Sequence, residues 1–338
     1  MTETTPEVAR PRRCWIYAII LFFGSPLIGE YLLGNLPITL LPVVFVLAPL
    51  YGGGALLVRE VARRFRLGWT GLLLLALAYA VVEEAFTTQS LFNPNYLGLR
   101  LLDFGFIPAI GMSSWWTIFV LGIHVIWSMA TPIALVEAMS GPMRREPWLG
   151  TRGIVVTTVL FALGCLATTS QQLKADPFRS TPAQVIGAVV VVVALVAAAF
   201  VFCRRVAPTA PRGSAQVPSP RLLLVYGLGL GSVFVIIAAV LKARLPIMLS
   251  VGGMVTTLAI MGIALRRWSR SAAWTPLSEL AFAGGLLLTY AWYGFVQVPS
   301  VGTVSPWVDA AGNLVFATGA VVLLVRAWKT SMKPDTTA

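Results

Sequence analysis

Two adjacent glutamates, Glu83 and Glu84, lie at the end of an apolar run, and the sequence Asn-Pro-Asn follows at residues 93–95. The only histidine of the chain, His124, lies in the next apolar run. A carboxylate within hydrogen-bond reach of an imidazole can act as a general base that activates water, with or without a metal ion. The first chemistry to consider is therefore hydrolysis at a site built from Glu83, Glu84 and His124.

Helix geometry limits how these groups can meet. Neighbouring positions on a helix point about 100° apart, so we expect one glutamate to face the site and the other to bond a neighbouring element. A zinc site would need three protein ligands, and Glu30 could supply a third beside one glutamate and His124. A divalent metal is thus compatible with the residues, although no motif identifies one.

The composition indicates that the scaffold lies in a lipid bilayer. Of the 338 residues, 57% are hydrophobic and only 11% are charged, whereas soluble domains carry roughly 25% charged residues. A net charge of +12 would suggest nucleic-acid binding in a soluble protein, but membrane topology explains it here. The three cysteines show no metal-type spacing, and no nucleotide, haem or flavin motif is present.

A membrane-spanning helix needs ~20 mostly apolar residues. Ten stretches meet this requirement, at about 14–34, 39–58, 68–88, 114–138, 153–170, 183–203, 222–241, 246–265, 277–297 and 307–327. The predicted fold is therefore an all-α, polytopic membrane protein with about ten transmembrane helices.

The basic residues predict the orientation of these helices. With the N-terminus inside, 20 of the 25 Lys and Arg residues fall in cytoplasmic segments, as the positive-inside rule requires. Most tryptophans also fall at predicted membrane boundaries. We expect a multi-pass protein of the cell (inner) membrane with both termini cytoplasmic.

This topology places the polar residues of the first four helices in the outer part of the membrane. His124 lies about ten residues into its helix, a rise of ~15 Å. We expect an outward-facing pocket, with the apolar segment 89–113 as its lid. The catalytic residues would be Glu83, Glu84 and His124, and the substrate-binding residues Glu30, Asn93, Asn95, Trp127 and Ser128.

A Pro- and Ser-rich stretch at 204–221 divides the predicted helices into two groups. It resembles a cytoplasmic linker loop because its composition favours turns. The predicted organisation is a six-helix bundle with the polar site (1–203), the linker (204–221) and a four-helix bundle with a short tail (222–338).

The Glu-Glu pair and His124 resemble the CPBP family of intramembrane proteases (CAAX-prenyl-protease and bacteriocin-processing, also called Abi). Its first motif, EExxxR, matches residues 83–88 with Thr88 in place of arginine, and its second, FxxxH, matches residues 120–124 with Val120 in place of phenylalanine. The third motif needs another histidine, which the chain lacks. The resemblance covers roughly residues 68–138 and implies that Glu83 or Glu84 activates water while His124 assists, in an active or a catalytically dead relative.

Two other functions fit the same residues. A small-molecule transporter is one, because ten helices with both ends inside resemble the drug/metabolite transporter superfamily. The crowding of ionisable groups in the first half argues against that family's five-plus-five repeat. A non-catalytic membrane or immunity protein with a structural acidic cluster is the other. The expected partners are the bilayer and an unidentified peptide or small molecule, with no nucleic acid.

Structural roles are equally compatible with several ionisable residues. The Glu-Glu pair could belong to a network with Asn, Thr or Arg, and His124 could be a hydrogen-bonding residue between helices. We expect Glu60 to pair with Arg63 or Arg64 at the membrane interface, because these are helical i,i+3 and i,i+4 positions. Glu137 should face Arg144 or Arg59.

Overall fold

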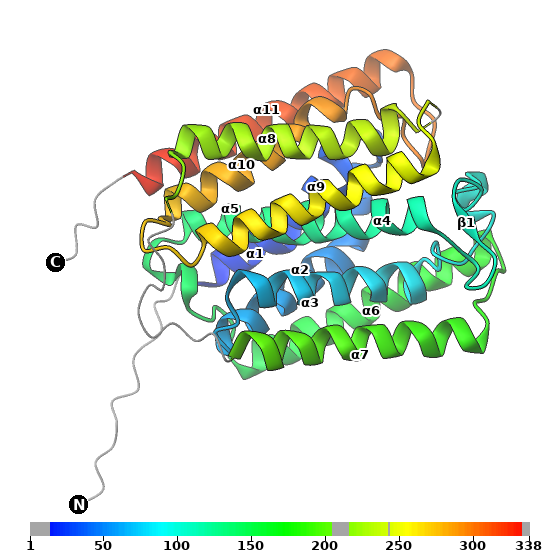
Figure 1. Ribbon diagram of the computed structural model, residues 1–338, viewed down its shortest axis with the longest axis horizontal. Helices are drawn as coiled ribbons and strands as arrows, with labels where there is room; N and C mark the ends of the chain where they lie inside the picture. The colour runs from blue at the N-terminus through cyan, green and yellow to red at the C-terminus, as the bar shows by residue number, and fades with distance from the viewer. Residues whose placement is uncertain (1–13, 205–215, 243, 333–338) are drawn as a thin grey trace, which may run out of the picture.

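The computed structural model describes residues 14–204, 216–242 and 244–332. Most of the predicted linker therefore lies outside the described residues, as do the basic residues at positions 10, 12 and 13. Within the described part the protein is all-α apart from one short hairpin, and its long helices run side by side (Figure 1). The predicted all-α polytopic fold is confirmed.

The first half of the chain contains helices interrupted by π-helical and 3-10 segments. In order these are α1 (Cys14–Pro26), η1 (Leu27–Leu32), η2 (Ile38–Val43), α2 (Val44–Arg64), α3 (Gly68–Val82), η3 (Glu83–Thr87), η4 (Tyr96–Gly98), β1 (Phe106–Ile107), β2 (Met112–Ser113), α4 (Ser114–Ile123), η5 (His124–Ala130), α5 (Thr131–Met139), η6 (Gly141–Arg145), α6 (Thr151–Ala175) and α7 (Pro182–Arg204). Strands β1 and β2 pair antiparallel, with Phe106 opposite Ser113.

The second half contains four α-helices and one π-helical segment among the described residues. They are α8 (Pro220–Val235), η7 (Ile236–Val240), α9 (Ile247–Trp268), α10 (Pro276–Tyr293) and α11 (Pro306–Ser331). Helix α10 packs against α8 and α11 and also against α5, so the two halves share one apolar core.

Nine helices of the described residues are long and apolar enough to cross a membrane. They match nine of the ten predicted stretches. The tenth stretch forms α10, which is helical over 18 residues but carries Glu279 and several polar and aromatic residues. Its buried position explains this composition, because a helix enclosed by other helices has no need of a lipid-facing surface.

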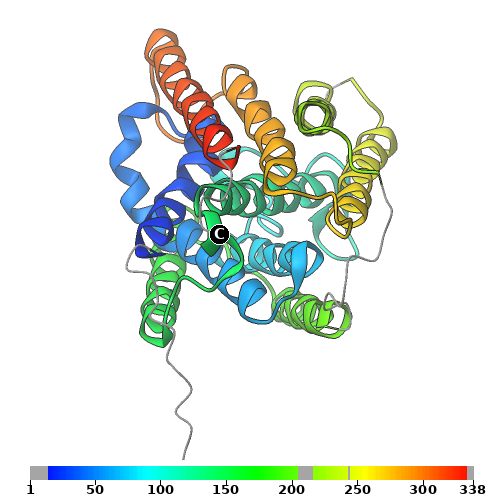
Figure 2. The ribbon, with the colours of Figure 1, turned by 90° about the vertical axis from the view of Figure 1, so that its left-hand side faces the viewer.

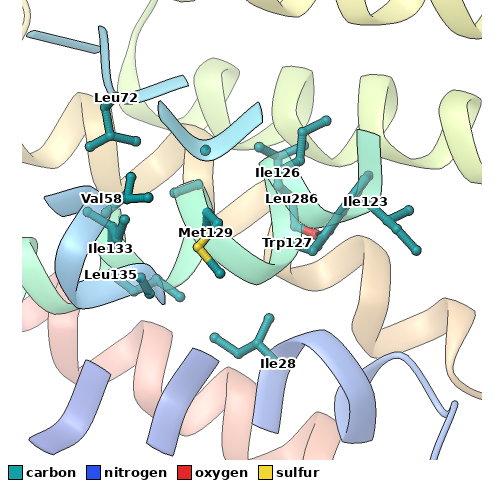
Figure 3. Close-up of a cluster of buried hydrophobic side chains, with 14 of the residues drawn as sticks. Ile28, Val58, Leu72, Ile123, Ile126, Trp127, Met129, Ile133, Leu135 and Leu286 are labelled. Atoms are coloured by element: carbon teal, nitrogen blue, oxygen red, sulfur yellow. Dashed lines mark hydrogen bonds between the residues drawn. The ribbon is translucent and has the colours of Figure 1, made fainter. Parts of the chain in front are cut away.

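The continuous helix formed by α4, η5 and α5 lies at the centre of the molecule. It is the most buried of the nine candidate spans of the described residues, because 72% of an apolar 18-residue stretch of this helix is buried inside the protein. Figure 3 shows Trp127, Met129 and Ile133 of this helix among apolar side chains from its neighbours, including Ile28 and Leu286. His124 and Ser128 are therefore held by the most buried of the candidate spans.

Glycines allow the close helix contacts that the sequence predicts. A Cβ atom at Gly52 would collide with the backbone of Phe22, and one at Gly227 would collide with the carbonyl oxygen of Phe282. These positions bring α1 against α2 and α8 against α10, as small residues do in membrane bundles.

The two ends of the bundle differ in charge. At one end lie the basic termini of α2 and α9 and the start of α10, with Arg63, Arg64, Arg266 and Arg267. We refer to this as the basic end. The other end carries segment 88–113, which contains η4 and the hairpin (Figure 1).

Candidate functional site

Three π-helical segments supply the polar groups of the candidate site. Segment η1 carries Glu30, η3 begins with Glu83 and Glu84, and η5 begins with His124. In η3 the amide of Thr88 donates to the carbonyl oxygen of Glu83 at 2.9 Å, five residues back. Such π turns are rare in proteins, and those that do occur are frequently found at functional sites.

His124 lies between the two glutamates, bonds Glu84 and contacts Glu83. Its Nε2 is 2.8 Å from Glu84 Oε1, and its Nδ1 is 3.1 Å from Glu83 Oε2. All three side chains are buried. The expectation that only one glutamate faces the site is wrong, because the two carboxylates reach opposite nitrogens of one ring from adjacent positions of a widened π turn.

Glu84 has hydrogen-bond partners on both carboxylate oxygens. Thr88 donates its hydroxyl to Oε2 at 3.0 Å, and Ser90 donates to the same oxygen. Ser90 in turn accepts a hydrogen bond from Trp116 Nε1 at 2.9 Å. These contacts fix Glu84 in position, so Glu84 can orient the His124 ring.

Glu83 has fewer partners than Glu84. Its Oε2 atom is buried and makes no hydrogen bond by strict geometry within the described residues, although it faces His124 Nδ1. Ser128 Oγ also lies 3.2 Å from that nitrogen. Glu83 is therefore the carboxylate with free capacity to accept a proton or hold a ligand.

Glu30 lies on η1, next to the Glu–His cluster but not in direct contact with it. It accepts hydrogen bonds from the Tyr51 hydroxyl and from Asn35 Nδ2, the latter at 2.6 Å. The Tyr51 ring lies 5.8 Å from the His124 ring, between centroids, and so connects Glu30 to the cluster. Sequence reasoning missed Tyr51 and Ser90, which carry no motif; it named Thr88 only as the residue in place of the motif's arginine.

The remaining predicted substrate-binding residues have different positions. Asn93 is buried and donates to Asp176 Oδ2 at 2.7 Å, whereas Asn95 is exposed. Trp127 stacks on Tyr290 with a centroid distance of 4.6 Å and donates to the carbonyl oxygen of Leu286. The structure thus brings Ser128 to the Glu–His cluster, while the contacts of Trp127 and Asn93 are with the core and with the end of α6.

Segment 88–113 contributes Tyr96 to the site. Burial, together with the nearby carboxylates of Glu84, Glu30 and Glu83, raises the pKa of Tyr96. Its phenol therefore lies within electrostatic range of the cluster at the end of the bundle where we expected a lid. Several apolar side chains of the same segment, such as Phe106 and Ile110, are exposed, as suits a segment in contact with a membrane interface.

A second ionic cluster lies at the basic end. Glu137 binds Arg63 through two hydrogen bonds of 2.6 Å and lies 3.0 Å from Arg59 Nε, which confirms the predicted pairing with Arg59. Glu60 pairs with Arg64 at 3.5 Å, also as predicted. Except for Arg64 these side chains are buried within the protein, and Glu60 also accepts hydrogen bonds from the backbone amides of residues 148 and 149.

Sequence reasoning missed Glu279 altogether. It is buried at the start of α10, accepts from Trp69 Nε1 at 3.0 Å and pairs with Arg145 at 2.8 Å. Its partners come from α3 and η6, which a sequence does not place beside α10.

The Glu83, Glu84 and His124 side chains could hold a metal ion. One ligand atom from each lies within 4.8 Å of the others. Two carboxylate oxygens and one imidazole nitrogen are ligands that zinc and related divalent ions accept, and a three-residue set leaves a coordination position open. Glu30, considered above as a third ligand, is not part of this set.

A family model matches residues 19–337, nearly the whole chain, and its description is "Uncharacterized membrane protein family". The protein belongs to this family. Neither the curated proteins nor the solved structures include a match to the chain. The membrane location is therefore supported both by the family and by the nine apolar helices.

Proposed function

We propose that this protein is an intramembrane hydrolase in which the cluster of Glu83, Glu84 and His124 activates a water molecule. The observation that carries this proposal is the position of the His124 ring between two buried carboxylates, at 2.8 and 3.1 Å. No Lys or Arg of the described residues lies within 4.0 Å of these carboxylates, so the cluster must be balanced by protons or by a bound cation. Groups that hold exchangeable protons in a dry site are suited to acid–base catalysis.

The hydrogen bonds suggest different roles for the two glutamates. Glu84 is fixed by Thr88 and Ser90 and holds His124 through Nε2, as the buried acid of a catalytic triad orients its histidine. Glu83 has free acceptor capacity and is our general base, taking the proton of the water that attacks the substrate. His124, in contact with both, passes a proton toward the leaving group.

The same three side chains are suited to a divalent cation. Such an ion would lower the pKa of a bound water and polarise the scissile carbonyl. A cation bound by Glu83 and His124 would occupy lone pairs that accept protons in the steps above, so those proton-transfer roles apply to the site without a cation.

The resemblance to CPBP proteases supports the hydrolase proposal at three positions. Glu83, Glu84 and His124, which match that family's motifs, meet in space at the distances given above. At the position of the family's arginine this chain has Thr88, whose hydroxyl bonds Glu84 Oε2. A single histidine in place of two means that Glu83 must take a role that the family divides among more residues.

Isotope labelling tests the proposal for any ester or amide substrate. Purified protein is incubated with lipid and peptide extracts of membranes in H₂¹⁸O, because hydrolysis of an ester or amide places ¹⁸O in the new carboxylate. We expect labelled products with the wild type and with Glu146→Gln, a control at an exposed carboxylate, and a loss of at least ~100-fold with Glu83→Gln. Identical labelled products from wild type and folded Glu83→Gln would refute the proposal.

A cation-coupled transporter is the second candidate, and the burial of the cluster favours it. A sealed acidic site that binds a proton or a cation is the usual coupling device of secondary transporters. Proton flux into proteoliposomes in the presence of a substrate gradient, absent in Glu83→Gln, would support the transporter over the hydrolase.

A further inference from the structure

A second site lies on the side of the bundle, separate from the Glu–His cluster. A groove of about 620 Å³ runs between α3, the α4–η5–α5 helix, α9 and α10. Figure 2 shows α3 in light blue and α9 in yellow on the same side of the bundle, flanking the central helix. The volume falls in the range of ligand pockets, ~300–1,000 Å³, and the lining is almost entirely apolar apart from the end near Trp69, Arg266, Trp274 and Glu279.

We propose that this groove binds an anionic glycerophospholipid, with its phosphate at the basic end and an acyl chain along the groove. This proposal does not depend on the hydrolase proposal, because no residue of the Glu–His cluster lines the groove.

The first argument is an unpartnered donor at the polar end. Trp274 is 9% exposed and lines the groove, and its Nε1 has no hydrogen-bond partner among the described residues. A buried N–H without an acceptor is destabilising, so an acceptor supplied by a ligand is favoured. A phosphate oxygen of a lipid headgroup is such an acceptor.

The second argument is charge. Arg266 lines the groove, is exposed, and has no acidic partner within 4.0 Å in the described part of the chain. Glu279 also lines it, but Arg145 at 2.8 Å and Arg144 at 3.9 Å compensate its charge. Three guanidinium groups against one carboxylate leave the mouth of the groove positive, which suits an anionic headgroup.

The third argument is depth. On α3 the lining runs from Trp69 to Leu77, a rise of ~12 Å, and one leaflet of the hydrocarbon core is ~15 Å thick. Thr131 lines the groove, is 1% exposed, and its hydroxyl has no partner among the described residues. Thr131 lies six residues before Glu137 on the same helix and is therefore about 9 Å farther from the basic end than Glu137 is. In a lipid whose phosphate lies at the basic end, the ester groups follow the phosphate and would lie at the depth of Thr131.

Two glycines on α9 allow a matched test. Gly262 lines the groove, and a Cβ there would meet open space, so Gly262→Phe fills the groove without a backbone clash. Gly252 on the same helix also has open space but lies outside the groove, so Gly252→Phe is the control. At the polar end, Trp274→Phe removes the N–H and keeps an aromatic side chain, and Arg266→Gln removes the charge, with Arg267→Gln as a charge control outside the lining.

The measurement is thermal stability of detergent-purified protein with added phosphatidylglycerol, phosphatidylcholine or inorganic phosphate, together with the phospholipid that copurifies. We expect phosphatidylglycerol alone to stabilise the wild type, Gly252→Phe and Arg267→Gln. Gly262→Phe should copurify several-fold less phospholipid than Gly252→Phe, and Trp274→Phe or Arg266→Gln should weaken phosphatidylglycerol binding about tenfold, as loss of one charge-assisted hydrogen bond does.

Three results would overturn the proposal. Equal stabilisation by phosphatidylcholine would show that the site does not select an anionic headgroup. Equal stabilisation by inorganic phosphate would show that the ligand is not a lipid. Equal phospholipid retention by folded Gly262→Phe and Gly252→Phe would show that the groove is not the site.

Discussion

Two ion pairs of equal length allow a direct test of how burial sets the value of a salt bridge in this protein. Arg63 and Glu137 approach to 2.6 Å with side chains 4% and 1% exposed, whereas Arg100 and Asp103 approach to 2.6 Å with side chains 74% and 53% exposed. The N–O distance is therefore the same in the two pairs, and the exposure of the side chains differs.

We predict that Glu137→Gln strongly destabilises the protein and that Asp103→Asn leaves its stability nearly unchanged. The substitution at Glu137 removes the charge that faces both Arg63 and Arg59, which are buried at the basic end. Breaking a buried pair in this way costs ~3–5 kcal/mol because a charge is left uncompensated. An exposed pair contributes little, since water screens it.

Thermal and chemical unfolding in detergent micelles measure the difference. A double variant, Arg63→Met with Glu137→Leu, should lose less stability than Glu137→Gln alone, because both charges of the pair are removed together and Arg59 keeps Glu60 at 2.8 Å. Equal unfolding midpoints for Glu137→Gln and Asp103→Asn would refute the reasoning.

Three further predictions concern packing around the site. Gly54→Ala should reduce folded yield, because its Cβ would collide with the Tyr79 ring, whose centroid lies 6.5 Å from that of His124; size-exclusion chromatography checks this. Trp127→Phe should cost ~0.5–1.5 kcal/mol in unfolding measurements, since it removes the 2.7 Å hydrogen bond from Nε1 to the Leu286 carbonyl oxygen. Asn93→Ala should raise hydrogen exchange in residues 88–98 while leaving the core unchanged, because it removes the bond to Asp176.

The sequence predicts the fold well because the hydropathy of a helix depends on whether lipid or protein surrounds it. Nine of the ten predicted stretches qualify as spans, and α10 differs because it is enclosed by protein. The pairing of Glu137 with Arg59 follows from the same reasoning, since two buried charges of opposite sign on neighbouring helices must meet. Glu279 lies inside the predicted stretch 277–297, but nothing in the sequence indicates its partners Trp69 and Arg145.

The site is only partly predictable, and the reason is the π turn. Glu83, Glu84, His124 and Ser128 come together as expected, but a regular helix places adjacent side chains about 100° apart, and no sequence signal indicates the wider turn of η3. A π turn holds one residue more than an α turn between its hydrogen-bonded groups. The local geometry of the cluster therefore depends on a single inserted position.

Deletion of Ala85 tests whether this inserted residue builds the site. Ala85 lies inside η3, and its removal would leave Glu83 and Thr88 four residues apart, so the Thr88-to-Glu83 bond would become an α-helical one. In the narrower turn Glu83 and Glu84 would point about 100° apart, so the two carboxylates could no longer both reach the His124 ring. We expect a protein that folds and inserts but loses the labelled hydrolysis products, whereas Ala85→Gly, which keeps the register, should retain them. If the deletion variant kept full activity, the π turn would be incidental, and catalysis would not require both carboxylates to reach the His124 ring.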